Sequence, residues 1–217
     1  MTKQPDQLRI TEIFHSLQGE STTVGLPTVF VRLTGCPLRC GYCDTAYAFT
    51  GGKRLSLDTI LSQVAAFTCQ HVCVTGGEPL AQPGCIDLLK RLCDAGHAVS
   101  IETSGARSIA EVDERVTIVM DLKTPDSGEC DKNLLSNISY LKPTDQIKFV
   151  LCSQKDYDWA CQMIIEHQLT KHVQVLFSPS FGQLNPTLLA EWILKDRLFV
   201  RLQLQLHKLL WNDAPGH

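Results

Sequence analysis

Short apolar runs rich in β-branched residues alternate along the chain with longer segments of helical periodicity. The runs predict β-strands at residues 28–34, 71–76, 98–103, 116–122, 146–151, 173–177 and 198–206. The helical periodicity predicts helices at residues 57–67, 84–95, 155–168 and 186–195. The last of these has Asn185 as a helix cap and Pro186 in its first turn, which is a common way for a helix to begin.

This order of elements predicts an α/β fold. Strand–helix units that repeat along a chain form a parallel sheet with right-handed crossovers. A complete eight-stranded barrel of such units takes about 250 residues, whereas this chain has 217. We therefore expect a partial, open (β/α)6-type parallel barrel with some helices shortened, and a single domain over residues 1–217.

Polar and glycine-rich residues follow four of the predicted strands, and α/β folds place their chemistry at the carboxyl ends of parallel strands. These stretches are TGC (34–36), TGGEP (75–79), ETSG (102–105) and DLKTPDSG (121–128). Directly after the first strand, Cys36, Cys40 and Cys43 form a C-x3-C-x2-C motif. Cysteine thiolates are the usual ligands of iron–sulfur clusters, which normally need four ligands. Three thiolates would leave one iron for a small molecule.

Composition and charge narrow the class of protein. A net charge of −3 leaves no basic excess for a phosphate backbone, and no stretch approaches the roughly 18 apolar residues of a membrane span. The first residues also lack the apolar core of a secretory signal. We expect a cytoplasmic protein without nucleic-acid or membrane partners, whose ten cysteines stay reduced. The clustered thiols are then metal ligands, with a zinc site completed by His15 or Cys69 as the alternative to an iron–sulfur cluster.

The cysteine motif, with Tyr42 before its last cysteine, resembles the signature of the radical S-adenosylmethionine enzymes. TGGEP resembles the GGE motif of that family, in which glycines let the backbone approach the cofactor. The resemblance implies a 4Fe-4S cluster on Cys36, Cys40 and Cys43, with S-adenosylmethionine chelating the fourth iron. It also implies that reductive cleavage of this cofactor yields an adenosyl radical, which abstracts a hydrogen atom from the substrate.

A narrower resemblance covers nearly the whole chain. The 7-carboxy-7-deazaguanine synthases, enzymes of queuosine and 7-deazapurine biosynthesis, have similar segments to EIFHSLQGE (12–20), FVRLTGC (30–36), CDT (43–45), ETSG (102–105) and LHKLLWN (206–212). The implied reaction converts 6-carboxy-5,6,7,8-tetrahydropterin to 7-carboxy-7-deazaguanine with loss of ammonia. The resemblance further implies Mg²⁺, a homodimer, and an electron donor, flavodoxin-like or similar, that the sequence does not identify.

Matching positions with this family assigns roles to individual residues. Substrate contacts fall on Leu17, Gln18, Gly19, Arg32 and Thr75. Cofactor contacts fall on Tyr42, Cys43, Asp44, Gly77, Asp121, Leu122 and Lys123. The Thr45 hydroxyl is assigned to Mg²⁺, although a threonine at this position is also a common helix cap. The guanidinium of Arg32 suits a substrate carboxylate, and its alternative is a salt-bridged strand residue.

Two departures from the family pattern and one histidine leave open questions. Ser21 stands where the QGEG motif has its second glycine, and D-L-K occupies 121–123 where many members have S-P-K. Lys123 is therefore either a cofactor contact or a solvated strand end. His207 is expected on the last strand, where it either lines the pocket or is a packed or rim residue.

Two other functions fit the cysteine motif. One is an activase that abstracts hydrogen from a glycine of a partner protein, and the QGE and CDT segments argue against it. The other is a non-enzymatic iron–sulfur or zinc redox sensor, which would leave TGGEP unexplained.

Overall fold

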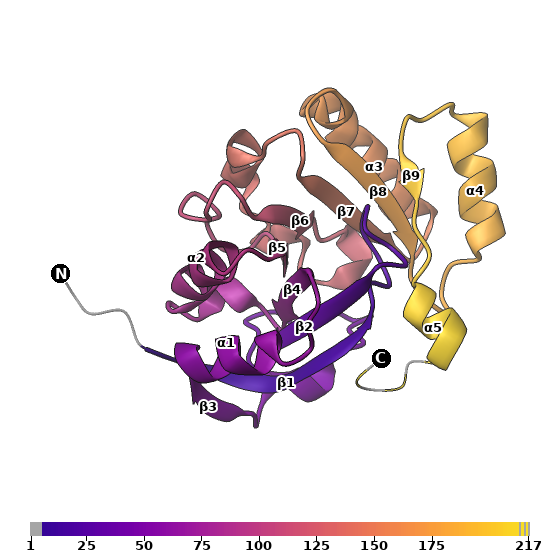
Figure 1. The fold of residues 1–217 in the computed structure, drawn as a ribbon. Coiled ribbons are helices and arrows are strands. Elements are labelled where there is room, and N and C mark those ends of the chain that lie inside the picture. The colour runs from indigo at the N-terminus through magenta and orange to yellow at the C-terminus, as the bar shows by residue number, and fades with distance from the viewer. Residues whose placement is uncertain (1–5, 213, 215, 217) are drawn as a thin grey trace.

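The computed structural model describes residues 6–212, 214 and 216 (Figure 1). Its strands form one nine-stranded sheet in the order β3-β1-β2-β4-β5-β6-β7-β8-β9. The strands are β1 (Gln7–Leu17), β2 (Pro27–Leu33), β3 (Lys53–Ser56), β4 (His71–Gly76), β5 (Ala98–Thr103), β6 (Thr117–Asp121), β7 (Gln146–Leu151), β8 (Gln174–Pro179) and β9 (Arg201–Leu202). Neighbouring strands from β2 to β9 are parallel, while β1 is antiparallel to both β2 and β3. Figure 1 shows β3 at one edge of this open sheet and β9 at the other.

The α-helices are α1 (Leu57–Ala65), α2 (Cys85–Asp94), α3 (Gln154–Glu166), α4 (Pro186–Lys195) and α5 (Leu206–Trp211). Between them lie the 3-10 turns η1 (Ala46–Phe49), η2 (Pro79–Ala81), η3 (Pro125–Ser127), η4 (Cys130–Lys132), η5 (Leu135–Tyr140) and η6 (Leu169–Lys171). Side chains that accept a backbone hydrogen bond begin three helices: Ser56 for α1, Ser153 for α3 and Asn185 for α4. After β5 and β6 the chain returns through loops and 3-10 turns. The predicted partial, open barrel with shortened helices is therefore confirmed.

Alternation along the central strands separates an apolar face from a polar one. In β2, Val29, Val31 and Leu33 are fully buried in the core with the helices, while Phe30 and Arg32 line a cavity on the inner face. β6 and β7 repeat this pattern, because Met120 and Phe149 are in the core while Asp121 and Lys148 line the cavity. Parallel sheets are usually apolar on both faces, so polar groups on the inner face mark it as a place for ligands.

The sequence prediction is wrong at both ends of the sheet. β1 and β3 were not predicted. The strand expected at residues 198–206 has only Arg201 and Leu202 paired with β8. The Gln203 backbone still donates to the Phe177 carbonyl of β8 at 2.9 Å, but beyond it the chain turns away and the backbone of Leu206 donates to the carbonyl of Gly19 at 3.0 Å. His207 therefore lies on helix α5 rather than on a strand.

The segment between β1 and β2 crosses the inner face of the sheet. The Gln18 amide approaches Glu102 of β5 at 3.5 Å, and the Thr22 backbone donates to the Gln146 side chain of β7 at 2.9 Å. Within this crossing, Ser21 has a φ of 69°, a left-handed conformation that favours glycine. The serine that replaces the family's glycine thus adopts the backbone conformation for which glycine is suited. Among the helices of residues 6–212, none combines the length and hydrophobicity that a bilayer crossing requires.

Candidate functional site

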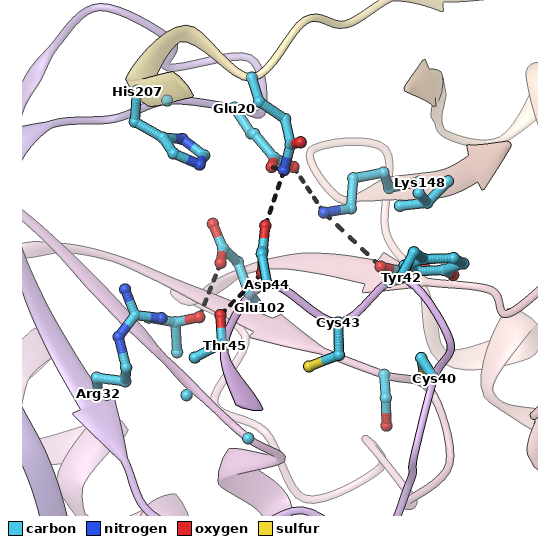
Figure 2. A pocket seen from close by; sticks show the side chains of 18 of the residues that line it. Glu20, Arg32, Cys40, Tyr42, Cys43, Asp44, Thr45, Glu102, Lys148 and His207 are labelled. Atoms are coloured by element: carbon cyan, nitrogen blue, oxygen red, sulfur yellow. Dashed lines mark hydrogen bonds and ion pairs between the residues drawn. The ribbon is translucent and has the colours of Figure 1, made fainter. Parts of the chain in front are cut away.

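A cavity of about 310 Å³ opens at the carboxyl ends of the central parallel strands. Cys36, Cys40 and Cys43 line it, in the loop that follows β2, and Figure 2 shows Cys40 and Cys43. Within the described residues these half-buried thiols are free of disulfides. Burial raises the pKa of Cys36 above its ordinary value and that of Cys40 to about 11. Both are therefore neutral thiols in the metal-free chain and would release protons when they bind a metal.

The residues that were expected to complete a zinc site lie far from these thiols. His15 contacts the ring of Phe67, with centroids 5.9 Å apart, and the Cys69 thiol donates to the Pro27 carbonyl at 3.2 Å. Pro27 begins β2, whereas Cys36 follows the end of that seven-residue strand, which spans roughly 20 Å. The zinc alternative through His15 or Cys69 is therefore wrong. Among the described residues, His, Cys, Asp and Glu side chains form no group of three that could hold a single ion.

The glycines of TGGEP pack directly against the loop that begins the cysteine motif. At Gly76, where φ is 140°, a Cβ would lie 2.2 Å from the carbonyl oxygen of Leu33. At Gly77, a Cβ would lie 2.1 Å from the carbonyl oxygen of Gly35 and 2.8 Å from the Cβ of Cys36. Real side chains do not approach so closely, so any larger residue would displace the cysteine loop.

Glu78, the acid of the same motif, is fully buried and ties the end of β4 to the end of β5. Its carboxylate accepts hydrogen bonds from the Thr103 hydroxyl, from the Ser104 hydroxyl and backbone, and from the Leu80 backbone, at 2.5–3.0 Å. These contacts fill the capacity of the carboxylate. Glu78 therefore fixes the position of the glycines, and its side chain is not available to a ligand.

We expect Glu78→Ala to lower the free energy of unfolding by about 3 kcal/mol, because buried donors would lose a charged acceptor. Glu78→Gln should cost less, since the amide oxygen still accepts. Urea denaturation measures both, with Glu111→Ala on the exposed surface as the control. A loss below about 1 kcal/mol for the alanine variant would contradict the tie between the two strand ends.

The residues predicted to contact a substrate share the inner wall of the cavity. All five line it: Leu17, Gln18, Gly19, Arg32 and Thr75. The Thr75 hydroxyl donates to one oxygen of Glu102 at 2.8 Å, and the Gln18 amide nitrogen lies 3.5 Å from the other oxygen. The carboxylate of Glu102, which also lines the cavity, therefore positions both Thr75 and Gln18.

Arg32 is both an ion-paired strand residue and a cavity residue. Its Nε donates at 2.7 Å to Glu12, its register partner on β1. The guanidinium carbon lies 5.6 Å from the ring centre of Phe14 and 5.8 Å from that of Tyr47. Within the described residues its terminal nitrogens have no hydrogen-bond partner. One edge of the guanidinium is thus anchored, and Figure 2 shows the group extending into the cavity below His207.

Asp44 and Thr45 continue the cysteine loop along the cavity. Thr45 precedes η1, but in the described part of the chain its side chain makes no capping bond and instead donates to Oδ1 of Asp44 at 2.9 Å. Oδ2 of Asp44 accepts from Lys208 at 3.0 Å and from Gln205 at 3.2 Å. Burial opposes ionisation of Asp44, yet the Lys208 ammonium holds the pKa of this carboxyl well below its usual range. The helix-cap alternative for Thr45 is therefore wrong.

Lys123 is only 8% exposed, so the alternative of a solvated strand end is wrong as well. Its ammonium pairs with Asp121 at 3.0 Å and lies 5.6 Å from the ring centre of Tyr42. Asp121 also faces Lys148 at 3.7 Å, and Lys148 pairs with Glu20 at 2.6 Å. Opposite charges thus alternate along this wall of the cavity.

Two predicted positions differ in the structure. Leu122 is fully buried in the hydrophobic core and does not line the cavity, because neighbouring residues of a strand point to opposite faces. Its side chain therefore cannot be a cofactor contact, which leaves only its backbone. His207 lines the cavity from α5, and its ring lies over Gly19, where a Cβ would be 2.2 Å from Nδ1.

Comparison with known proteins identifies the family. Residues 30–146 match the model of the Radical SAM superfamily. A 7-carboxy-7-deazaguanine synthase of Chlorobaculum tepidum is 47% identical over 213 residues, which cover 96% of this chain and 97% of the relative. The chain belongs to the 7-carboxy-7-deazaguanine synthase family. A member from Thermoplasma acidophilum is 37% identical over 95% of this chain and 99% of its own length. The crystal structure of QueE from Escherichia coli shares the fold, with a TM-score of 0.77 at 23% identity over 93% of this chain and 95% of that one.

Membership in this radical SAM family implies a 4Fe-4S cluster and S-adenosylmethionine, and the cavity suits both. Its three thiols leave one cluster position for a small-molecule ligand. Two buried polar atoms beside them, the Tyr42 hydroxyl and Oδ1 of Asp121, have no hydrogen-bond partner within the described residues. A buried polar atom without a partner is costly. The family's cofactor offers polar groups that would satisfy these two atoms.

Sequence reasoning missed several polar residues of the synthase cavity: Glu20, Glu102, Lys148, Gln205 and Lys208. For Glu102 and Lys148 the signal was a charged residue inside an otherwise apolar strand, which places the charge on the inner face. Gln205 and Lys208 carried no comparable signal, because Gln205 was expected in a strand at residues 198–206 and Lys208 lies just beyond that range.

Proposed function

We propose that the protein converts 6-carboxy-5,6,7,8-tetrahydropterin to 7-carboxy-7-deazaguanine with loss of ammonia, as a radical SAM enzyme of queuosine and 7-deazapurine biosynthesis. The observation that carries this proposal is that one cavity is lined both by the three thiols and by polar side chains such as Gln18, Arg32 and Thr75. Relatives that span the whole chain bear the synthase name. Radical hydrogen abstraction requires cofactor and substrate side by side, and one shared cavity provides this.

On the cofactor side, Cys36, Cys40 and Cys43 would hold the cluster. With S-adenosylmethionine bound, the cluster supplies the adenosyl radical that removes a hydrogen atom from the substrate. The other proposed cofactor contacts that line the cavity are Tyr42, Asp44, Gly77, Asp121 and Lys123. The close packing of Gly77 on the loop of Cys36 supports this assignment, since it brings the two motifs together.

On the substrate side, the terminal nitrogens of Arg32 would bind the pterin carboxylate in a bidentate contact. Gln18 and Thr75, both held by Glu102, would face the pterin edge, which needs several donors and acceptors. Leu17 and Gly19 complete this wall. The backbone of Leu206 donates to the carbonyl of Gly19, so α5 is held against this wall of the cavity.

One anaerobic incubation tests the proposal. The reconstituted protein is mixed with dithionite, S-adenosylmethionine and the carboxypterin, and the products are separated by mass spectrometry. We expect 7-carboxy-7-deazaguanine to accumulate only when all components are present. Cleavage of S-adenosylmethionine with the pterin left intact would show a radical enzyme of different specificity and would refute the synthase proposal.

We further propose that Mg²⁺ binds the Thr45 hydroxyl together with substrate oxygens and water. Magnesium prefers oxygen ligands and often takes few of them from the protein. Because Thr45 donates its hydrogen to Asp44, the lone pairs of its oxygen remain to accept a cation. This geometry supports a metal ligand.

Thr45→Ala is expected to lower the affinity for Mg²⁺ by at least about tenfold, so that turnover with the metal falls to the level measured with a chelator. Thr45→Ser keeps the hydroxyl and should keep most of the response. The side chain caps no helix, so the stability cost of the alanine variant should be limited to its hydrogen bond with Asp44, about 1–2 kcal/mol. An alanine variant that still responds to Mg²⁺ like the parent would remove Thr45 from the metal site.

We also propose a homodimer, a flavodoxin-like or similar electron donor, and a cytoplasmic enzyme built as a single domain over residues 1–217. Exposed apolar side chains support an interface between copies: Phe199 is 89% exposed, Leu209 61% and Leu210 51%. Free cysteines throughout the described residues agree with a reducing compartment.

A further inference from the structure

We propose that Lys208 and Gln205 are positioning residues that keep the Asp44 carboxylate out of the metal site and thereby aim the Thr45 hydroxyl at the cation. The inference rests on the proposed binding of Mg²⁺ by Thr45. It assigns a role to α5 and the residue before it, which carry none of the cluster ligands.

The two oxygens of Asp44 have different partners. Oδ2 accepts from Nζ of Lys208 at 3.0 Å and from Nε2 of Gln205 at 3.2 Å, whereas Oδ1 accepts only the Thr45 hydroxyl at 2.9 Å among the described residues. A hydroxyl has one hydrogen, and here Asp44 receives it. The oxygen of Thr45 can then act only as an acceptor. Figure 2 shows Asp44 between Thr45 and Glu20.

The Asp44 carboxylate and the Thr45 hydroxyl are neighbours that could both bind Mg²⁺, and this arrangement leaves only the hydroxyl available. An ionised carboxylate is a stronger ligand for Mg²⁺ than a hydroxyl, so Asp44 without a cationic partner would turn to the metal. Lys208 prevents this because its ammonium binds Oδ2 and compensates the negative charge of the ionised carboxylate. Its side chain is 7% exposed, with the ammonium 5.4 Å from the ring centre of Phe181, so it is held in place by packing. The Asp44 side chain is 32% exposed, so the packed ammonium is the fixed partner of this pair.

Gln205 connects the loop of Asp44 and Thr45 to the segment around Glu20, which carries proposed substrate contacts. Its Nε2 donates to Glu20 at 2.8 Å and to Asp44 at 3.2 Å, so a single amide bridges two carboxylates. Glu20 is itself fixed by Lys148 at 2.6 Å. Gln205 therefore fixes the position of Asp44 relative to Glu20, which follows the proposed substrate contacts Gln18 and Gly19 in the chain. A cation on Thr45 would then lie where the pterin oxygens can reach it.

Manganese binding tests the proposal without relying on turnover. Mn²⁺ prefers the same oxygen ligands and is counted by electron paramagnetic resonance, in reconstituted protein with S-adenosylmethionine but without pterin. We expect the parent to bind Mn²⁺ weakly and Lys208→Met to bind it at least about tenfold more tightly, because Asp44 becomes a ligand. Asp44→Asn combined with Lys208→Met should lose the gain. Lys208→Arg should behave like the parent.

Two further variants guard against a structural explanation. Lys195→Met makes the same change at an exposed lysine of α4, outside the cavity, and should leave Mn²⁺ affinity unchanged. Lys208→Gln replaces the methionine variant if that one does not fold, and should show the same gain. Unchanged Mn²⁺ affinity in a folded Lys208 variant that still turns over pterin with Mg²⁺ would overturn this inference and leave the proposed function intact. A parent enzyme that makes product without any response to Mg²⁺ or Mn²⁺ would overturn it together with the metal role of Thr45.

Discussion

Alanine in place of any one of Cys36, Cys40 or Cys43 is expected to abolish cleavage of S-adenosylmethionine. Each thiolate would hold one iron of the cube, and two thiolates do not retain a cluster that normally needs four ligands. After anaerobic reconstitution, we expect about four irons per chain in the parent and less than about one in each variant. An iron assay and the amount of 5'-deoxyadenosine formed measure the two losses.

Cys85→Ala is the matched control. Cys85 begins α2, is fully buried and packs in the hydrophobic core, away from the cavity. Its loss should leave iron content and cofactor cleavage unchanged and cost about 1 kcal/mol of stability. Equal loss in all four variants, or stoichiometric zinc with no uptake of iron, would be incompatible with the cluster assignment.

Arg32→Lys is expected to lower kcat/KM for the pterin by about 10- to 100-fold, the equivalent of one lost hydrogen bond to a charged group. Lysine keeps the charge but not the planar fork that a bidentate carboxylate contact requires. Binding of S-adenosylmethionine should be unaffected, since Arg32 lies on the opposite side of the cavity from Cys40 in Figure 2.

Arg54→Lys, on the exposed edge strand β3, is the conservative control for this change and should be neutral. Steady-state kinetics over a range of pterin concentrations separates KM from kcat. A lysine variant with parental kinetics would make Arg32 a structural partner of Glu12 and nothing more.

The central strands were predictable because burial on the helix side demands continuous β-branched runs. β7 begins and ends where its sequence pattern does, and β4 and β5 also match their predicted ranges. The sequence pattern did not predict β1, because much of this strand is only half-buried at the edge of the parallel strands. Its apolar residues therefore do not form a clear alternating pattern. At the other edge, the LQLQL alternation suggested a strand, but the backbone contacts with β8 end at Gln203.

The local parts of the site were predictable for a similar reason. Three cysteines within eight residues, and glycines directly after a strand, reveal themselves by spacing alone. The partners of Asp44 do not, because Gln205 is 161 residues away along the chain and meets it only through the fold. Glu78 illustrates another limit, since its place in a ligand-binding motif gave no hint that Thr103 and Ser104 occupy its carboxylate.

The contacts of Gln205 and Lys208 with Asp44 join helix α5 to the cysteine loop, and Gln205 is 161 residues away from Asp44 along the chain. If α5 came away from the sheet, the cysteine loop would lose these contacts. Order in the loop that carries the cluster ligands therefore depends on a segment that is remote in sequence.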